Sequence, residues 1–201
     1  MKQRPVGKLL ALGLSLLLVL AFTPAAFAAE VSVADEVALH NAVANSAAGD
    51  VIKLTASFQL TKSVDIPADK NVVLDLNGQS ITVTKDESSG RSLYAVYNNG
   101  TFTLRDSVGS GSITARGLQN NETGTMVIDS GKIVACDENG GACVWNEGNV
   151  TVNGGYFTTT SAGSPSDTYG IGCLNNQPSG NALITGGEFI NVNRRTYEYP
   201  V

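Results

Sequence analysis

One short pattern recurs through the second half of the chain and limits the folds available to it. Gly100, Gly124 and Gly148 are equally spaced, and Gly180 follows after a longer interval. Apolar residues stand two and four positions after each glycine, and in three of the four copies a second glycine follows seven positions on. A period of about 20 to 50 residues indicates stacked supersecondary units, so the sequence predicts a repeat architecture.

Three positions of the repeat are apolar in every copy and form three columns. The first column is predicted to contain Phe102, Met126, Val150 and Ala182. The second is predicted to contain Leu104, Ile128, Val152 and Ile184, and the third Ile113, Ile133, Phe157 and Phe189. Residues 72–81 fit as an earlier copy, with Leu74, Leu76 and Ile81 in the three columns.

A unit of this length with two or three short strands and no helix suits one turn of a parallel β-helix. Successive turns would then lie about 4.8 Å apart, and residues of equal phase would stack into continuous internal ribs. The glycines would mark corners that need a positive φ or a close backbone approach. We therefore expect an all-β solenoid of roughly 24-residue coils.

Residues 1–28 have the parts of an export signal. A basic start precedes an apolar run over residues 9–22, and a small-residue cleavage site follows at 26–28. We expect cleavage of residues 1–28, a mature protein that is secreted or at the cell surface, and no membrane span. The alternative is a membrane anchor, but the apolar run is short for a span of about 20 residues.

Residues 29–50 are predicted to cap the first coil, and residues 51–201 to form the coils. Leu39, Ala42, Val43 and Ala47 recur at helical spacing, which predicts a helix over residues 35–48. Asp35 is the expected N-cap, and Gly49 is expected to end the helix. At the other end Arg194, Arg195 and Pro200 either blunt the last strand edge, or the chain is truncated within a longer protein.

The N-terminal segment and the first coils resemble a known superfamily. The helix, the stretch at residues 50–83 with its segment "IPADKNVVLDLNG", and the later Asn-x-Gly coils are similar to pectate-lyase-like right-handed parallel β-helix proteins. The nearest resemblance is to secreted, adhesin-like surface proteins of Gram-positive bacteria. This resemblance implies a right-handed coil. It also implies one of two activities: non-catalytic glycan binding, or polysaccharide lyase or hydrolase chemistry.

Charge and histidine content exclude several classes of function. The chain has 13 basic and 18 acidic residues, and without the three basic residues of the leader the balance is 10 against 18, a net charge of −8. That charge argues against nucleic acid or an anionic membrane as a partner. His40 is the only histidine and is expected on the helix surface. A histidine-based triad or a multi-histidine metal site is therefore excluded.

Three cysteines are too few for a disulfide framework. Cys136 and Cys143 flank a six-residue loop, and either a bridge between them or buried free thiols fits the sequence. Cys143 and Cys173 are expected in neighbouring coils but one position apart in phase, so their side chains would face opposite sides of the strand. That arrangement disfavours a bridge between them.

Two further columns precede the first glycine of each coil. Asn98, Asn146 and Asn175 share a phase, with Asn120 as a further member, and such asparagines can form a hydrogen-bonded ladder. Tyr97, Trp145 and Leu174 occupy the adjacent phase and are expected to face outward because Val96, Val144 and Cys173 face inward. The aromatic residues Tyr97 and Trp145 are our candidate binding residues. They either stack against sugar rings or pack against loops such as residues 161–170.

Charged residues after the third strand of each coil could line one edge of the stack. The catalytic candidates there are Arg116, Asp137, Glu138 and Asp167, with Asp86 and Glu87 nearby. This edge would suit Ca²⁺ or a glycan, but solvated loop charges are the simpler explanation. None of the aligned strand columns stacks two carboxylates, which a lyase or hydrolase of this fold would need.

These observations favour a monomeric, non-catalytic scaffold or adhesin that needs no cofactor or metal. Its expected partner is a polysaccharide or a glycan on a host or cell surface. The alternative is a polysaccharide lyase or glycoside hydrolase acting on acidic polysaccharide, with Ca²⁺ as a possible cofactor if it is a lyase.

Overall fold

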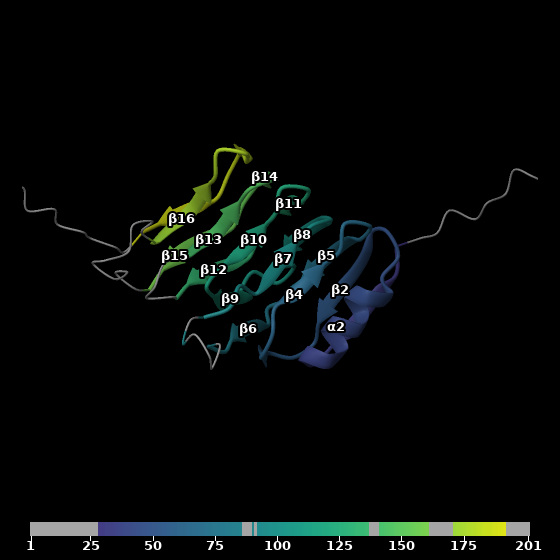
Figure 1. The fold of residues 1–201 in the computed structure, drawn as a ribbon. Helices are drawn as coiled ribbons and strands as arrows, with labels where there is room; N and C mark the ends of the chain where they lie inside the picture. Colours follow the sequence, from purple (N-terminus) through teal and green to yellow (C-terminus); the bar gives the residue numbers. More distant parts are fainter. Residues whose placement is uncertain (1–27, 86–89, 91, 137–140, 161–170, 192–201) are drawn as a thin grey trace, which may run out of the picture.

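The computed structural model describes residues 28–85, 90, 92–136, 141–160 and 171–191. Their strands form three parallel sheets. The coils stack along one axis, from the purple N-terminal end to the yellow last coil in Figure 1. After the helix, each coil adds one strand to each of the three sheets in turn. The fold is therefore the predicted all-β parallel β-helix, and one short helix lies at its start.

The three sheets are defined by their strands, in order of pairing. Sheet A contains β1 (Glu30–Val33), β2 (Asp50–Leu54), β5 (Asn71–Asp75), β8 (Thr101–Arg105), β11 (Thr125–Ile128), β14 (Asn149–Val152) and β17 (Asn181–Ile184). Sheet B contains β3 (Phe58–Leu60), β6 (Ser80–Val83), β9 (Ser112–Ala115), β12 (Lys132–Ala135), β15 (Tyr156–Thr159) and β18 (Glu188–Ile190). Sheet C contains β4 (Val64–Ile66), β7 (Val96–Asn98), β10 (Leu118–Asn120), β13 (Gly141–Asn146) and β16 (Ile171–Asn176).

The strand register confirms all three apolar columns from β8 onward. Members of each column face one another across every pair of neighbouring coils. The register also places Ile81 of the earlier copy opposite Ile113, as predicted.

The first two columns of the earlier copy are displaced by two residues from the prediction. Val72 lies opposite Phe102, and Leu74 lies opposite Leu104. Leu76 belongs to neither column and is buried in the turn after β5. Val72, Leu74 and Leu76 are apolar at alternate positions, so the sequence is compatible with the predicted and the observed register. The turn after β5 leaves only Val72 and Leu74 in the strand and thereby selects the observed one.

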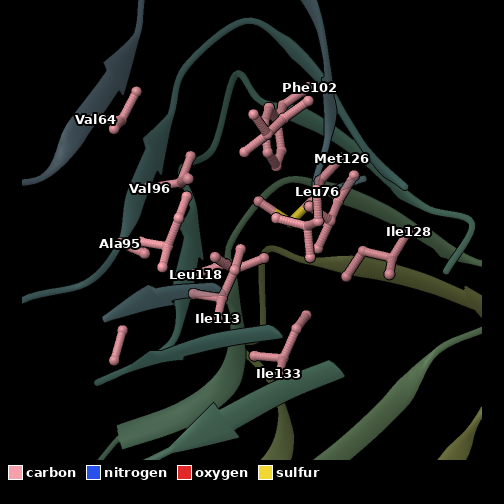
Figure 2. Close-up of a cluster of buried hydrophobic side chains, with 14 of the residues drawn as sticks. Val64, Leu76, Ala95, Val96, Phe102, Ile113, Leu118, Met126, Ile128 and Ile133 are labelled. Carbon is pink, nitrogen blue, oxygen red and sulfur yellow. The ribbon is translucent and has the colours of Figure 1, made fainter. Parts of the chain in front are cut away.

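The inward ribs from the three sheets meet in a single continuous core. Figure 2 shows Val96 and Leu118 from sheet C, Phe102 and Met126 from sheet A, and Ile113 from sheet B converging on the interior. All of these side chains are almost completely buried. Burial of apolar surface is the main favourable term in folding, so the rib residues hold the coils together.

The repeat glycines are needed for two different reasons. Gly131, Gly155 and Gly187 have φ values of +104°, +103° and +98°, a region that side-chain-bearing residues rarely adopt. Gly124 has no positive φ, but a Cβ on it would lie only 2.6 Å from the carbonyl oxygen of Asn98. In these three coils the second glycine therefore sets the chain direction, whereas the first glycine at Gly124 allows neighbouring coils to approach closely.

A ladder of buried asparagine amides runs along the axis beside the first glycines. Asn98 Nδ2 donates to Asn120 Oδ1 at 2.7 Å, and Asn120 Nδ2 donates to Asn146 Oδ1 at 2.7 Å. Asn146 Nδ2 continues the ladder to Asn176 Oδ1 at 2.6 Å. The ladder is confirmed, but the assignment of Asn175 to it is wrong. Two asparagines adjoin there, and the first of them lies opposite Trp145 instead of Asn146.

The N-terminal helix α2 (Glu36–Asn45) packs on the first coil with Leu39, Ala42 and Val43 buried. Asp35 is the N-cap, as predicted, and its side chain accepts a hydrogen bond from the Ala38 amide at 2.8 Å. The helix ends three residues earlier than predicted because Ser46 adopts an extended conformation as the C-cap. Strand β1, which the sequence did not indicate, pairs in parallel with β2 ahead of the helix.

The last described coil leaves part of its apolar rib exposed. Its rib residues Ile184 on β17 and Phe189 on β18 are 49% and 37% exposed. Leu183, which lies opposite Thr151 and is not a rib residue, is 58% exposed. The predicted edge residues Arg194, Arg195 and Pro200 lie outside the described residues, as does the leader up to residue 27. Within the described part of the chain, no helix has the length and apolar character needed to cross a membrane.

Candidate functional site

The outer face of sheet C carries the candidate binding residues in one straight row. We call this the sheet C row; its members face each other in register across neighbouring strands. The row consists of Asp65, Tyr97, Gln119, Trp145 and Asn175. The placement of Leu174 beside the aromatic residues is wrong, because Leu174 lies opposite Val144 and packs partly against the core. The sequence alignment shifted β16 by one residue relative to β13, and this shift produced the errors for both Asn175 and Leu174.

Tyr97 and Trp145 lie two coils apart with Gln119 between them. Two coil rises place their backbones about 10 Å apart along the axis. Both side chains are half-buried, so each ring presents part of its surface outward from the strand. The sheet that carries them is built of paired strands, which gives the two rings a fixed separation.

Each aromatic ring is held by specific neighbours. Tyr97 packs edge to face against Tyr94, with ring centroids 5.6 Å apart, and the Arg116 guanidinium lies 4.9 Å from the centre of the Tyr94 ring. Burial raises the pKa of the Tyr97 phenol, and the positive charge of Arg116 partly opposes that effect. The indole nitrogen of Trp145 donates to Glu147 Oε1 at 3.1 Å. These contacts fix the orientation of both rings.

A second row of polar side chains runs beside the sheet C row, one step into the turn. Its members each follow a ladder asparagine directly, and we call it the turn row: Asn99, Asn121, Glu147 and Gln177. Asn121 Nδ2 donates to Asn99 Oδ1 at 2.9 Å, and Gln119 Nε2 donates to Asn121 Oδ1 at 2.9 Å. Aromatic rings and amide or carboxylate groups therefore share one surface.

Sequence reasoning did not single out Gln119 or the turn row as part of a site. The available signal was the residue after each ladder asparagine, which is Asn, Asn, Glu or Gln in the four coils. All four side chains can hydrogen-bond to hydroxyl groups. The candidate residues taken from the sequence were ionisable or aromatic, and such a choice overlooks a row of amides.

The acidic edge proposed from the sequence is only partly within the described residues. Asp137, Glu138 and Asp167 lie outside them, as do Asp86 and Glu87. Arg116 is described, and it stacks on Tyr94 beside the sheet C row. The described residues contain no group of three or more His, Cys, Asp or Glu side chains that could hold a metal ion.

Carboxylates on sheet A alternate with a cation instead of forming a pair. Asp75 lies opposite Arg105, and the Arg105 Nε atom donates to Asp75 Oδ2 at 3.0 Å. Asp129 follows in the same column one coil further on. The alignment from the sequence missed Asp75 because of the displaced early copy. The column therefore does hold two carboxylates, but Arg105 separates them and neutralises Asp75.

The cysteines and His40 occupy positions that the sequence placed only in part. No disulfide joins the three cysteines, all of which are among the described residues. Ala142 pairs with Gly172 and Val144 with Leu174, which sets Cys143 opposite Cys173, so the prediction that these two face opposite sides is wrong. The slip of one residue in β16 caused that error as well. His40 lies on α2 and is half-buried beside Glu36.

No protein-family model, curated protein or solved structure matches the chain. Function is therefore inferred from the geometry of this chain and from its sequence.

Proposed function

We propose that the protein is a secreted or cell-surface β-helix that binds a linear polysaccharide or a surface glycan along the sheet C row, without transforming it. The observation that carries the proposal is the pair Tyr97 and Trp145, held in register two coils apart on one face. The export signal in the sequence supports the location. The resemblance to adhesin-like members of the pectate-lyase-like superfamily supports the class of function.

The geometry of the row suits an extended sugar chain. Sugar rings have apolar faces that pack on aromatic rings, and a chain lying along the axis would meet one coil about every 4.8 Å. The repeat of an extended pyranose chain is of similar length, so Tyr97 and Trp145 would stack on alternate sugars. The sugar between them would lie over Gln119.

The polar groups beside the rings would give the site its specificity. Asn121 and Gln119 offer amide groups toward hydroxyls, and Glu147 offers a carboxylate that already accepts from the Trp145 indole. A few placed polar groups beside an apolar surface are the usual composition of a ligand site. The negative charge of Glu147 and Asp65 would favour a neutral or basic sugar at those positions.

Glycan-array binding by the chain and three variants tests the proposal. Trp145→Ala and Tyr97→Ala should each weaken binding at least about tenfold, which corresponds to about 1.4 kcal/mol. Tyr156→Ala is the matched control, because Tyr156 is a half-buried aromatic residue on sheet B, where it lies beside Lys132. Binding that survives both sheet C variants, or that Tyr156→Ala abolishes equally, would refute the assignment of the site.

The same preparation distinguishes binding from catalysis. Incubation with polyuronates and Ca²⁺ should give no unsaturated product in the ultraviolet. Turnover that is lost in Arg116→Ala or Asp137→Ala would instead support the lyase alternative. Trp145 is the only tryptophan in the chain, so its fluorescence reports ligand binding directly.

A further inference from the structure

The β-helix brings together two cysteines that belong to successive coils. Strands β13 and β16 pair in parallel, with Ala142 opposite Gly172 and Val144 opposite Leu174. Cys143 and Cys173 lie between these partners and therefore face each other across neighbouring coils.

Neighbouring strands place such a residue pair at a suitable separation for a disulfide. The strand spacing of about 4.8 Å lies within the Cα separations of roughly 4.4 to 6.8 Å that disulfides span. The two thiols also interact with each other through their side chains. Each sulfur lies against a backbone carbonyl of sheet B: Cys143 Sγ is 3.1 Å from Thr158 O, and Cys173 Sγ is 3.4 Å from Phe157 O.

The third cysteine is held by a different contact. Cys136 follows β12 and its sulfur lies 3.9 Å from Ser92 Oγ. It is partly exposed, whereas Cys143 and Cys173 are buried. The geometry therefore favours one pairing over the Cys136–Cys143 pairing that sequence spacing had left open.

We propose that Cys143 and Cys173 form a disulfide between the last two described coils when the chain folds under oxidising conditions. Each thiol loses one proton and one electron, and a disulfide such as oxidised glutathione takes the two electrons and is cleaved to two thiols. One Cys–Cys bond forms as one glutathione disulfide bond breaks. The bridge stands independently of the glycan-binding proposal.

Burial determines when the bridge forms. The thiolate is the reactive species in thiol–disulfide exchange. Burial raises the pKa of the Cys143 thiol to about 12 and also raises that of Cys173, so few thiolates exist once the coils have closed. The bond therefore forms during folding, before β16 docks fully on β13.

The bridge would act as a latch on the last described coil. In a solenoid each coil contacts only its neighbours, so the terminal coil opens most easily. The last described coil has exposed apolar residues on β17 and β18, and β16 is the strand of that coil that carries Cys173. A covalent bond from β16 to β13 would hold the last described coil against the coil before it.

Refolding in a mixture of reduced and oxidised glutathione tests the bridge. After unfolding, alkylation should label one thiol per chain, at Cys136, and non-reducing peptide mapping should find the Cys143–Cys173 link. Cys136→Ser should keep the bridge and leave nothing to alkylate, whereas Cys143→Ser should leave two alkylated thiols. Alkylation of all three cysteines, or a link between Cys136 and Cys143, would overturn the proposal.

Hydrogen exchange gives a second readout that does not require refolding. Peptide mapping first shows whether the isolated chain contains the link. Amide hydrogen exchange is then measured on that sample before and after reduction. Amides of β17 and β18 should exchange at least about tenfold faster after reduction, while those of β5 and β8 stay unchanged. Equal exchange in both samples of a bridged chain would refute the latch.

Discussion

Replacement of Asn120 by alanine tests whether the buried ladder holds the coils together. Asn120 is fully buried, and its Nδ2 donates to Asn146 Oδ1 at 2.7 Å and to Asn149 O at 3.0 Å. A third acceptor, Gly124 O, keeps its bond from the Asn149 amide. Asn120 Oδ1 accepts from Asn98 Nδ2, which has two carbonyl acceptors besides. Asn149 O also keeps a backbone donor, because it lies within the parallel pairing of β14 with β11. Alanine therefore leaves one buried acceptor, Asn146 Oδ1, without a donor.

The expected cost follows from that count. A buried polar group left without its partner costs about 1 to 3 kcal/mol, so the loss of the bond to Asn146 Oδ1 predicts a destabilisation of about 1 to 3 kcal/mol. A loss of that size is measurable against the total stability of a typical domain, about 5 to 15 kcal/mol. Asn120→Asp should cost at least as much, because a carboxylate cannot donate to Asn146 Oδ1 and would be buried beside it.

Asn121→Ala is the matched control for the ladder variants. Asn121 is the next residue, faces outward, and makes side-chain hydrogen bonds to Asn99 and Gln119 that water can replace. We expect it to cost under about 1 kcal/mol. Urea unfolding followed by far-ultraviolet circular dichroism and by Trp145 fluorescence measures both variants. If the costs of Asn120→Ala and Asn121→Ala differ by less than about 0.5 kcal/mol, the low end for one typical hydrogen bond, the ladder does not stabilise the stack.

Three further predictions concern the core, a corner and the response to acid. Phe157→Ala should cost about 3 to 5 kcal/mol in urea unfolding, because the ring is completely buried and stacks on Phe189; a loss under about 1 kcal/mol would contradict this. Gly131→Ala should lower the melting temperature measurably, since L-residues at a φ of +104° cost about 1 to 2 kcal/mol; an unchanged temperature would contradict the strain. Burial acts to raise the pKa of Asp75, but the amides of Ser107 and Asn77 outweigh it and lower that pKa. The carboxylate therefore stabilises the fold above the unfolded pKa of about 3.9, and that contribution is lost as the pH falls through the folded pKa. Melting temperatures of Asp75→Asn should depend less on pH below about pH 4 than those of the wild type, and equal slopes would refute the assignment.

The sequence predicted the register well where coils have equal length. Gly100, Gly124 and Gly148 recur at a constant interval, and every apolar position counted from them falls in its predicted column. A constant coil length fixes the phase because each residue lies above its counterpart. The same alternation of apolar residues then identifies the inner face.

The errors fall where a coil changes length or a position changes character. The outward position before the ladder is aromatic at Tyr97 and Trp145, but in β16 it is Asn175. Asn175 is the first polar residue after the apolar run, so the sequence alignment assigned it to the ladder in place of Asn176. The predicted positions of Leu174 and Cys173 were displaced by one residue as a result. The strand pairing that separates Asn175 from Asn176 depends on backbone contacts between coils, which a single sequence does not display.

The candidate site was predicted only in part. Tyr97 and Trp145 are visible as aromatic residues at one phase, and the structure keeps them in one row. Gln119 directly precedes the ladder residue Asn120 and so shares their phase, but an amide side chain was not among the aromatic and ionisable residues considered as candidates. Amides also carry no distinctive spacing in a sequence that uses asparagine at many turns.

The constant coil has a consequence for the length of the molecule. Gly124 and Gly148 occupy equivalent positions one coil apart, so deletion of residues 125–148 would join two ends that already match in phase. The shortened chain would lose one rise, about 4.8 Å, with the remaining ribs still aligned. Removal of a single residue from a strand would instead turn the apolar side chains beyond it outward. Loops accept extra residues, as the longer interval before Gly180 shows, but the strands can gain or lose length without disruption only by whole coils.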